Sequence, residues 1–399
     1  MRLAALFLAF APAAPAAAAG GFEDPGPHPA GWQAVSFVSG STIKGRVYYP
    51  ALAAGEGAPA DPGAGYPLVG LIHGQTFVPS DYDLLSLHLA SHGFVVCSVG
   101  PLAGPLHAPP MAAAKMQDML AWFTGESANP ASPFAGLAGG APWAVLGHSL
   151  GGSALPHVAA LEPKVRSIVA LAPYYDGSAT LAEKLAAFDG AKLAVAGALD
   201  HVVPPADHAY PMHLDASPLG RSVYVELEGT GHYGSLDAWI AGILDPLPWE
   251  EQHRLHRKVV TAFLLAQSAG LEDAYAAILG GGGAQEPFAR ECSSADPPLW
   301  VAPSATEHAV AAGLGGRPLD PAWIAVAALP GSTATRAGTL GLDPAGLRFA
   351  FAGDLGAEGC ADVPWASPWI PAGQVLYVQG MALHPAGPVL SRTAIFVAP

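Results

Sequence analysis

The first two thirds of the chain alternate short apolar runs with stretches of helical length. Six runs of strand length are apolar on both faces, as expected for central strands of a parallel sheet covered by helices. They span 67–73, 94–99, 143–147, 166–172, 192–198 and 222–227. Four stretches with helical spacing lie between them, at 81–92, 111–123, 149–161 and 179–188. The alternation predicts a doubly wound α/β domain with a mostly parallel sheet.

Two further elements flank this pattern. Residues 33–50 have the pattern of an antiparallel hairpin that turns at Gly40. Residues 249–270 have the length and spacing of a long closing helix. Pro156 lies inside the expected helix 149–161 and should kink or shorten it.

The pattern changes after a run of four glycines at 280–283. The chain becomes rich in Pro and Gly, which favours loops and turns. Strand-like pieces follow at 322–329, 347–353, 374–383 and 393–399. We therefore expect a catalytic domain at 30–279, a Gly-rich linker at 280–290, and a small all-β, sandwich-like accessory domain at 291–399.

The N-terminus has the pattern of a secretory signal peptide. Arg2 precedes the apolar residues 3–10, and an Ala-rich stretch ends near Ala19. We expect residues 1–19 to be removed on export, which gives a secreted or periplasmic protein without a later transmembrane segment. The alternative is an N-terminal membrane anchor, which Pro12 and Pro15 weaken.

Export would determine whether the three cysteines can be oxidised to disulfides. Cys97 lies in a run that reads as a buried strand, so it is expected to be an inert core thiol. Cys292 and Cys360 both fall in the C-terminal part. In an oxidising compartment these two could form a disulfide, if their geometry permits it.

Composition excludes some classes of partner. The 399 residues include 17 Lys plus Arg and 32 Asp plus Glu, a formal net charge of −15. No run of five or more basic residues occurs, so nucleic acid and anionic lipid are poor partners, because phosphate binding needs clustered cations. No His, Cys and Asp cluster has metal-ligand spacing, and no metal or cofactor is expected. Hydrophobic residues make up 51% of the chain, enough for a substantial core.

Ser149 is the candidate nucleophile. It stands in a G-x-S-x-G pattern, residues 147–151, after an expected strand and before an expected helix. That setting is the one a nucleophile elbow requires. The helix N-terminus would add backbone N–H groups near the reacting oxygen. The simpler alternative is a serine on a tight turn.

A serine hydroxyl needs a base, and the base needs an acid that orients it. In hydrolases of this fold the order along the chain is Ser, acid, His. Asp200 follows the run 192–198, and His232 lies in the loop after the run 222–227. At the carboxyl edge of a parallel sheet these side chains can meet Ser149.

Other titratable residues compete for these roles. Asp200 is favoured as the acid because it comes directly after its strand. His148 lies within the elbow and cannot easily reach Ser149, so we interpret it as packing or as the rim of the substrate cleft. The remaining competitors are interpreted as loop residues or as a surface face of the closing helix: His201, Asp207, His208, His213, Asp215, His253 and His256.

Acyl transfer also needs donors for the developing oxyanion. The N–H of Leu150, directly after Ser149, is one candidate. The N–H of Gln75 is the other, because "HGQ" at 73–75 follows an early strand and Gly74 permits a sharp turn.

Taken together, these residues resemble the α/β-hydrolase superfamily, over about residues 35–270. The nearer likeness is to bacterial cutinase-like and PET-hydrolase-type polyesterases, with dienelactone hydrolases and platelet-activating-factor acetylhydrolases as relatives. The stretches that carry it are 73–100, 147–154, 171–177, 197–205 and 229–234.

The resemblance implies roles for individual residues. Ser149, Asp200 and His232 match the family's triad. Gln75 falls where polyesterases usually carry an aromatic residue, which makes that wall of the cleft more polar. Leu150 falls where they often carry Met. The cleft aromatic of the family corresponds to Tyr174 or Tyr175.

The sequence thus favours a secreted serine hydrolase that cleaves carboxylic esters, including polymeric ones, through an acyl-enzyme. Two alternatives remain open. One is a hydrolase of small esters or lactones. The other is a non-catalytic surface-binding protein with a vestigial hydrolase domain, which the large β-rich tail motivates. In the first reading, the tail would position the enzyme on a surface.

Overall fold

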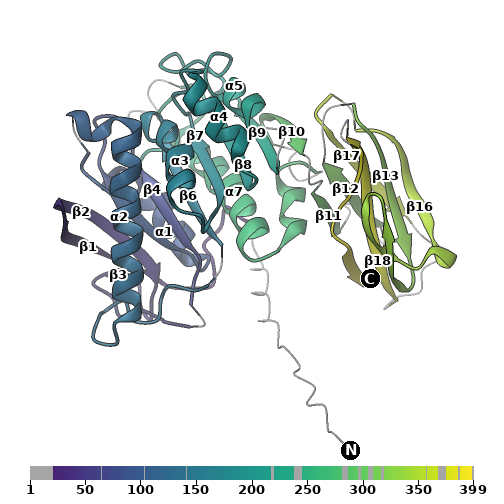
Figure 1. The fold of residues 1–399 in the computed structure, drawn as a ribbon, viewed down its shortest axis with the longest axis horizontal. Coiled ribbons are helices and arrows are strands. Elements are labelled where there is room, and N and C mark those ends of the chain that lie inside the picture. Colours follow the sequence, from purple (N-terminus) through teal and green to yellow (C-terminus); the bar gives the residue numbers. More distant parts are fainter. Residues whose placement is uncertain are drawn as a thin grey trace, which may run out of the picture.

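The structure is a computed structural model. It describes residues 21–399 except 64, 103, 141, 217–219, 238–244, 281–285, 295–297, 304–308, 316–318, 356, 367–373, 385–386 and 398–399. The expected signal peptide at 1–19 and half of the expected linker, 281–285, lie outside the described residues. What remains forms an α/β region and a C-terminal β region, which lie beside each other in Figure 1.

The α/β region is built on a ten-stranded sheet. Its six central strands are parallel, while β2 and β10 join antiparallel at the two sides. In spatial order the strands are β10 (Phe288–Ser294), β9 (Arg221–Leu227), β8 (Ala191–Gly197), β7 (Val165–Leu171), β6 (Trp143–His148), β4 (Leu68–Ile72), β5 (Val95–Val99), β2 (Ser41–Pro50), β1 (Ala30–Ser39) and β3 (Gly55–Glu56). The expected α/β class with a mostly parallel sheet is confirmed.

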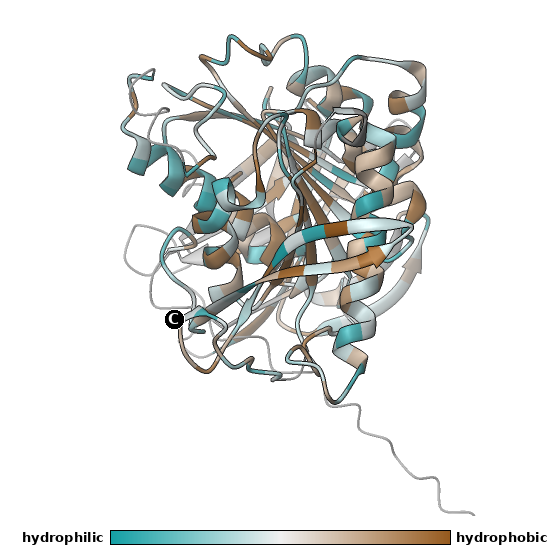
Figure 2. Cartoon of the chain, turned by 90° about the vertical axis from the view of Figure 1, so that its left-hand side faces the viewer, coloured by the Kyte–Doolittle hydropathy of each residue, from teal (hydrophilic) through white to brown (hydrophobic). Residues whose placement is uncertain are grey.

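Helices cover both faces of this sheet, which explains why its central strands are apolar throughout (Figure 2). α1 (Asp83–Ser91) and α7 (Trp249–Ser268) enclose one hydrophobic core. The second core lies under α2 (Pro109–Ala128), α3 (Leu150–Leu161), α4 (Ala179–Ala187) and α5 (Ala209–Asp215). Short 3₁₀ helices η1 (Pro79–Tyr82), η2 (Gly104–His107) and η3 (Glu272–Ala277) complete the region.

Two local expectations can be compared with these elements. The hairpin β1–β2 turns at Gly40, whose φ of 65° is in the left-handed region that glycine adopts most easily. Pro156 does not shorten its helix, because α3 runs through it to Leu161. Pro156 lacks the N–H that would bond to the Gly152 carbonyl, so α3 loses one intrahelical hydrogen bond there and still continues.

The C-terminal β region is a sandwich with its own core. Leu299, Leu314, Ile324 and Val378 are among the buried residues between its two sheets. One sheet contains β11 (Leu299–Pro303), β12 (Ala309–Gly315) and β17 (Cys360–Ala366). The other contains β16 (Arg348–Asp354), β13 (Pro321–Ala327), β18 (Val375–His384), β19 (Gly387–Leu390) and β20 (Ala394–Val397), and a separate hairpin pairs β14 (Pro330–Thr335) with β15 (Gly338–Leu342). The 3₁₀ turn η4 (Pro344–Gly346) connects that hairpin to β16.

The junction between the regions lies later in the chain than the expected linker. Strand β10 begins at Phe288, inside that linker, and pairs along its full length with β9. The sandwich then packs on the α/β region, where the Val301 N–H donates to Asp273 Oδ1 at 2.7 Å. The division into a catalytic and an accessory domain stays a prediction, but β10 is part of the large sheet.

The three cysteines are thiols, and the described residues contain no disulfide. Cys97 is fully buried in β5, as expected, and burial raises the pKa of its thiol. Cys360 packs against the core cluster that contains the buried Cys292. The possible Cys292–Cys360 disulfide is not formed in this structure.

Candidate active site

Ser149 occupies a sharp turn between β6 and α3. Its φ of 53° and ψ of −122° lie outside the conformations that side-chain-bearing residues normally adopt, which costs about 1–3 kcal/mol. Its N–H donates to the Leu171 carbonyl at 3.0 Å, and its carbonyl accepts from the Tyr174 N–H at 2.9 Å. A Cβ at Gly151 would lie 2.3 Å from the Ile72 carbonyl oxygen, so this position requires glycine. The strand-to-helix turn expected from G-x-S-x-G is thus present.

Ser149, His232 and Asp200 come together at the carboxyl edge of the sheet. His232 Nε2 lies 3.0 Å from Ser149 Oγ, and His232 Nδ1 lies 2.7 Å from Asp200 Oδ2. A carboxylate only accepts, so Nδ1 of a neutral His232 carries the proton and Nε2 is free to accept from the serine hydroxyl. The three residues therefore have the hydrogen-bond geometry that activates a serine.

The Asp200 carboxylate is fixed on both oxygens. Asp200 is only 2% exposed, and its Oδ1 accepts the N–H groups of Val202 and Val203, both at 2.8 Å. Burial of a charge is costly unless hydrogen bonds compensate for it. These bonds hold the carboxylate in one rotamer while Oδ2 faces His232.

The two candidate oxyanion donors border Ser149. A Cβ at Gly74 would lie 3.2 Å from Ser149 Cβ, so the loop that contains Gln75 passes directly beside the serine. Leu150 is the first residue of α3, and its N–H has no intrahelical acceptor. Gln75 itself is exposed to solvent. The loop of Gln75 and the first residue of α3 thus both border the candidate nucleophile, while their role as oxyanion donors stays a prediction.

A buried polar chain behind the site was not expected from the sequence. The Tyr82 hydroxyl lies 2.8 Å from His148 Nδ1 and accepts the Gly74 N–H at 3.0 Å. His148 Nε2 donates to the His232 carbonyl at 3.0 Å. Because a carbonyl only accepts, the proton of His148 is on Nε2, and Tyr82 donates to Nδ1. The chain therefore connects the loop at Gly74 to the backbone of His232.

His148 can act in this chain only as a neutral imidazole. It is fully buried, and burial lowers the pKa of its side chain to about 3. The sequence reveals G-H-S but not the partner, because Tyr82 lies 66 residues earlier in the chain.

Two residues expected to line the substrate cleft lie elsewhere. His148 is fully buried, and Tyr175 is only 2% exposed, with its hydroxyl donating to Asp215 Oδ2 at 2.5 Å. Tyr174 is 40% exposed, and its ring centroid lies 5.1 Å from that of His208. Of the three residues, only Tyr174 is placed to meet a substrate.

The competing histidines have other partners. His208 Nδ1 contacts the Tyr175 carbonyl at 2.7 Å, and His213 Nδ1 contacts Ser222 Oγ at 2.8 Å. His253 and His256 are buried, whereas the sequence had suggested a surface face. α7 is buried along most of its length between the sheet, α1 and η3, so polar residues on it must find partners inside the protein. None of these four histidines lies in the Ser149 hydrogen-bond chain.

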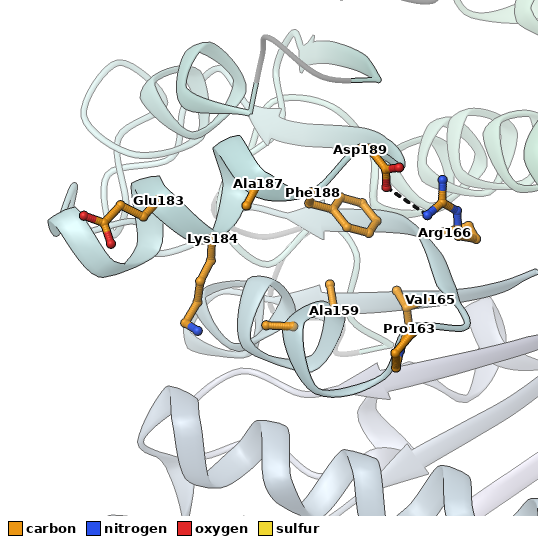
Figure 3. A pocket seen from close by; sticks show the side chains of 10 residues that line it. Ala159, Pro163, Val165, Arg166, Glu183, Lys184, Ala187, Phe188 and Asp189 are labelled. Atoms are coloured by element: carbon orange, nitrogen blue, oxygen red, sulfur yellow. Dashed lines mark hydrogen bonds and ion pairs between the residues drawn. The ribbon is translucent and has the colours of Figure 1, made fainter.

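A hollow of about 460 Å³ lies away from this constellation (Figure 3). It opens between the last turns of α3 and α4, beside the start of β7, at the amino edge of the sheet. Its polar groups are surface groups, such as Arg166 and Asp189, which pair at 2.8 Å and are about half exposed. We assign no function to this hollow, because ligands of open α/β sheets bind at the carboxyl edge.

The described part of the chain contains no group of three or more His, Cys, Asp or Glu residues that could hold a metal ion. Within the same residues, no helix has both the length and the apolar character needed to cross a bilayer. The fold and the Ser149–His232–Asp200 arrangement are those of the α/β-hydrolase superfamily.

A family model described as PET hydrolase-like matches residues 12–239, and the chain belongs to this family. Its similar proteins include Cutinase 1 of Thermobifida cellulosilytica, 25% identical over 168 residues, which are 42% of this chain and 61% of that protein. A cutinase of Thermobifida fusca (strain YX) is 26% identical over 168 residues, 42% of this chain and 53% of its own length. The chain thus spans little more than half the length of these relatives.

Proposed function

We propose that the protein is a serine hydrolase that cleaves carboxylic esters, including polyesters, through an acyl-enzyme. The hydrogen-bond chain from Ser149 through His232 to Asp200 is the observation that carries this proposal. Membership of the PET hydrolase-like family supports the reaction class. The cutinases that it resembles support the same class.

In the first half of the reaction, Ser149 Oγ attacks the ester carbonyl while His232 Nε2 takes the hydroxyl proton. Asp200 stabilises the imidazolium that forms and keeps its ring oriented. The N–H groups of Leu150 and Gln75 receive the developing oxyanion. The tetrahedral intermediate then collapses, His232 gives the proton to the leaving alcohol, and Ser149 remains esterified.

In the second half, a water molecule replaces the alcohol. His232 takes its proton as it attacks the acyl-enzyme, and the same oxyanion donors act again. Protonation of Ser149 releases the carboxylic acid. Both halves need His232 neutral at the outset, so turnover is expected to fall as the pH drops below the range of the histidine pKa.

The residues beside Ser149 are open to solvent, which favours substrates that the protein does not have to surround. Tyr174 is 40% exposed and Gln75 lies at the surface beside Ser149. An open site of this kind suits bulky or polymeric esters as well as small ones. A panel of p-nitrophenyl esters of increasing chain length, aryl esters, a lactone and poly(ethylene terephthalate) film would rank these classes.

The decisive test is Ser149→Ala, with Ser132→Ala as a control at a partly buried serine outside the site. We expect Ser149→Ala to lose covalent labelling by diisopropyl fluorophosphate and about 10⁴-fold or more of p-nitrophenyl ester turnover. Ser132→Ala should keep both. Labelling and turnover that persist in Ser149→Ala would exclude Ser149 as the nucleophile. Absence of any turnover in the unaltered protein would favour a surface-binding protein.

We further propose that the protein is exported. The support is the sequence of residues 1–19, with Arg2, an apolar core and an Ala-rich end. Determining the N-terminus of the protein recovered outside the cytoplasm tests this. An intact Met1 would contradict cleavage.

A further inference from the structure

The C-terminal sandwich has an apolar outer face. Along β13, Ile324 and Val326 point into the sandwich core, so Trp323 and Ala325 point to the other side of the sheet. A solvated face of an antiparallel sheet normally carries polar residues. Here Trp323 pairs with Met381 of β18, and Met381 pairs with Leu390 of β19. This row of three large apolar residues crosses three strands.

The hairpin β14–β15 converts this face into a groove. Leu342 and Leu340 of β15 pack over Ala325 and Ala327 and so cover one part of the face. The part beside the hairpin forms a cavity of about 380 Å³, within the size range of small-ligand sites. Its lining includes Trp323, Leu340, Leu347, Met381, Pro388 and Leu390.

One buried amide holds the hairpin against the sheet. Gln379 is 4% exposed, its Oε1 accepts the Gly341 N–H at 2.9 Å, and its Nε2 donates to the Thr339 and Ser391 carbonyls at 3.1 and 2.8 Å. These bonds satisfy the amide and connect β15, β18 and the segment after β19. The groove is therefore formed before any ligand arrives, which lowers the entropic cost of binding.

The charge of the groove is opposite to that of the whole protein. Its lining residues include one arginine, Arg336, and no aspartate or glutamate, although the chain has a net charge of −15. Arg336 is exposed, and it forms no ion pair with the described residues. An apolar floor with one arginine at its rim selects a ligand that is apolar along its length and ends in an anion.

We propose that this groove binds a polyester chain at its carboxylate end. The proposal rests on the proposed ester hydrolysis, because each hydrolysed bond leaves such an end. The repeating units lie over Trp323 and Met381, and the terminal carboxylate pairs with Arg336. The sandwich thereby holds the protein on a surface that its own α/β region has begun to cleave.

Adsorption to polyester particles tests the groove without turnover. The parent is full-length Ser149→Ala, and the particles are poly(ethylene terephthalate) with either free or methyl-esterified carboxyl ends. We expect Trp323→Ala to weaken adsorption to both particles about tenfold, since an aromatic stacking contact is lost. Arg336→Gln should weaken adsorption two- to fivefold on the free-acid particles only. The matched control, Arg392→Gln, removes an exposed arginine of the same sandwich outside the groove and should change neither.

Three results would overturn the proposal. One is unchanged adsorption in Trp323→Ala and Arg336→Gln. Another is an equal effect of Arg336→Gln and Arg392→Gln, which would reflect general charge. The third is self-association of the parent that Trp323→Ala abolishes, which would show that the groove holds a second copy.

Folding and catalysis are followed separately. Trp323→Phe keeps an aromatic ring and should retain most of the adsorption, even if Trp323→Ala lowers the melting temperature. When the groove variants are made in the protein that retains Ser149, turnover of a soluble p-nitrophenyl ester should be unchanged by each of them. Loss of soluble turnover in the unaltered protein would refute the proposed function, whereas loss of end-dependent adsorption alone would refute the groove.

Discussion

The α/β region and the C-terminal sandwich differ in where they place polar groups. In the α/β region, Asp200, His232 and His148 are almost fully buried and paired, at the edge where parallel strands end. In the sandwich, the notable surface is the groove on the outer sheet face, whose lining includes one cation, the exposed Arg336. The first arrangement suits bond cleavage, which needs fixed charges in a water-poor site. The second suits weak adhesion, which needs area and an apolar surface.

The comparison predicts that changes to buried polar groups in the α/β region have large effects, and that changes on the sandwich face have small ones. The largest is expected for Asp200→Asn. An amide at this position leaves the geometry intact but favours the wrong tautomer of His232, so kcat should fall about 10⁴-fold. Steady-state turnover of a p-nitrophenyl ester measures this. The control is Asp207→Asn, a nearby aspartate outside the hydrogen-bond chain, which should retain normal kcat.

The second prediction concerns acid. Burial lowers the pKa of His148 to about 3 and those of His73 and His256 to about 4, so these side chains stay neutral in the folded protein. In the unfolded chain they take up protons below about pH 6.5. Their stabilising contribution is therefore complete above that pH and is lost as the pH falls toward 4. At pH 5 each costs about 2 kcal/mol of unfolding free energy.

All three histidines lie in the α/β region, so acid should loosen that region first. Amide hydrogen exchange at pH 7.5 and pH 5, corrected for the intrinsic rate, measures opening of each region separately. Protection should fall in β4, β6 and α7 and change little in β13 and β18. A uniform loss of protection in both regions would contradict the assignment of neutral buried histidines.

Much of the α/β region could be predicted from the sequence because its signals are local. Central strands are short apolar runs, and Ser149, Asp200 and His232 each lie in the loop or turn that follows one of them. The topology of a parallel sheet then brings strand ends to one edge. The Tyr82–His148 contact could not be predicted, because no periodicity relates a residue of a 3₁₀ turn to one at the end of β6.

The strands of the sandwich and of the junction were harder to predict from the sequence, because their signals are not local. β14 and β15, "PGSTAT" and "GTLGL", are short and contain Pro, Gly and Ala, which are depleted in strands, and β15 is held against β18 by Gln379. β10, "FARECSS", follows a glycine run and carries two charges, so its place in the large sheet depends on β9. The groove forms only where the hairpin β14–β15 packs beside strands β13, β18 and β19.

The third prediction tests to which region β10 belongs. A chain ending at residue 284 lacks β10, whereas one ending at 297 keeps it, and both lack the sandwich. β10 buries Phe288 and Cys292 against the α/β core, so its loss should cost about 4 kcal/mol. We expect the shorter chain to melt about 10 °C below the longer one. Equal melting temperatures would place β10 outside the cooperative unit.

The smallest of these effects is expected for Tyr82→Phe, which removes one hydroxyl behind the site. The Gly74 N–H loses its acceptor and His148 Nδ1 loses its donor, so the oxyanion loop and the His232 backbone are both less constrained. Since Tyr82 touches neither substrate nor the reacting atoms, it acts by positioning. We expect kcat to fall about 10- to 50-fold, with KM changed less than threefold, as for loss of an interaction used mainly in the transition state.

Tyr48→Phe is the matched control, because Tyr48 is also fully buried and its hydroxyl donates to Asp83 at 2.5 Å, away from Ser149. Each variant removes one fully buried hydroxyl together with its hydrogen bonds, so both should lose about 1–3 kcal/mol of unfolding free energy. Only Tyr82→Phe should lower kcat. If both lower kcat equally, the hydroxyl of Tyr82 serves stability alone, and the buried polar chain would then resemble the hydrogen bonds of Gln379 in the sandwich, which hold strands together without touching a reaction.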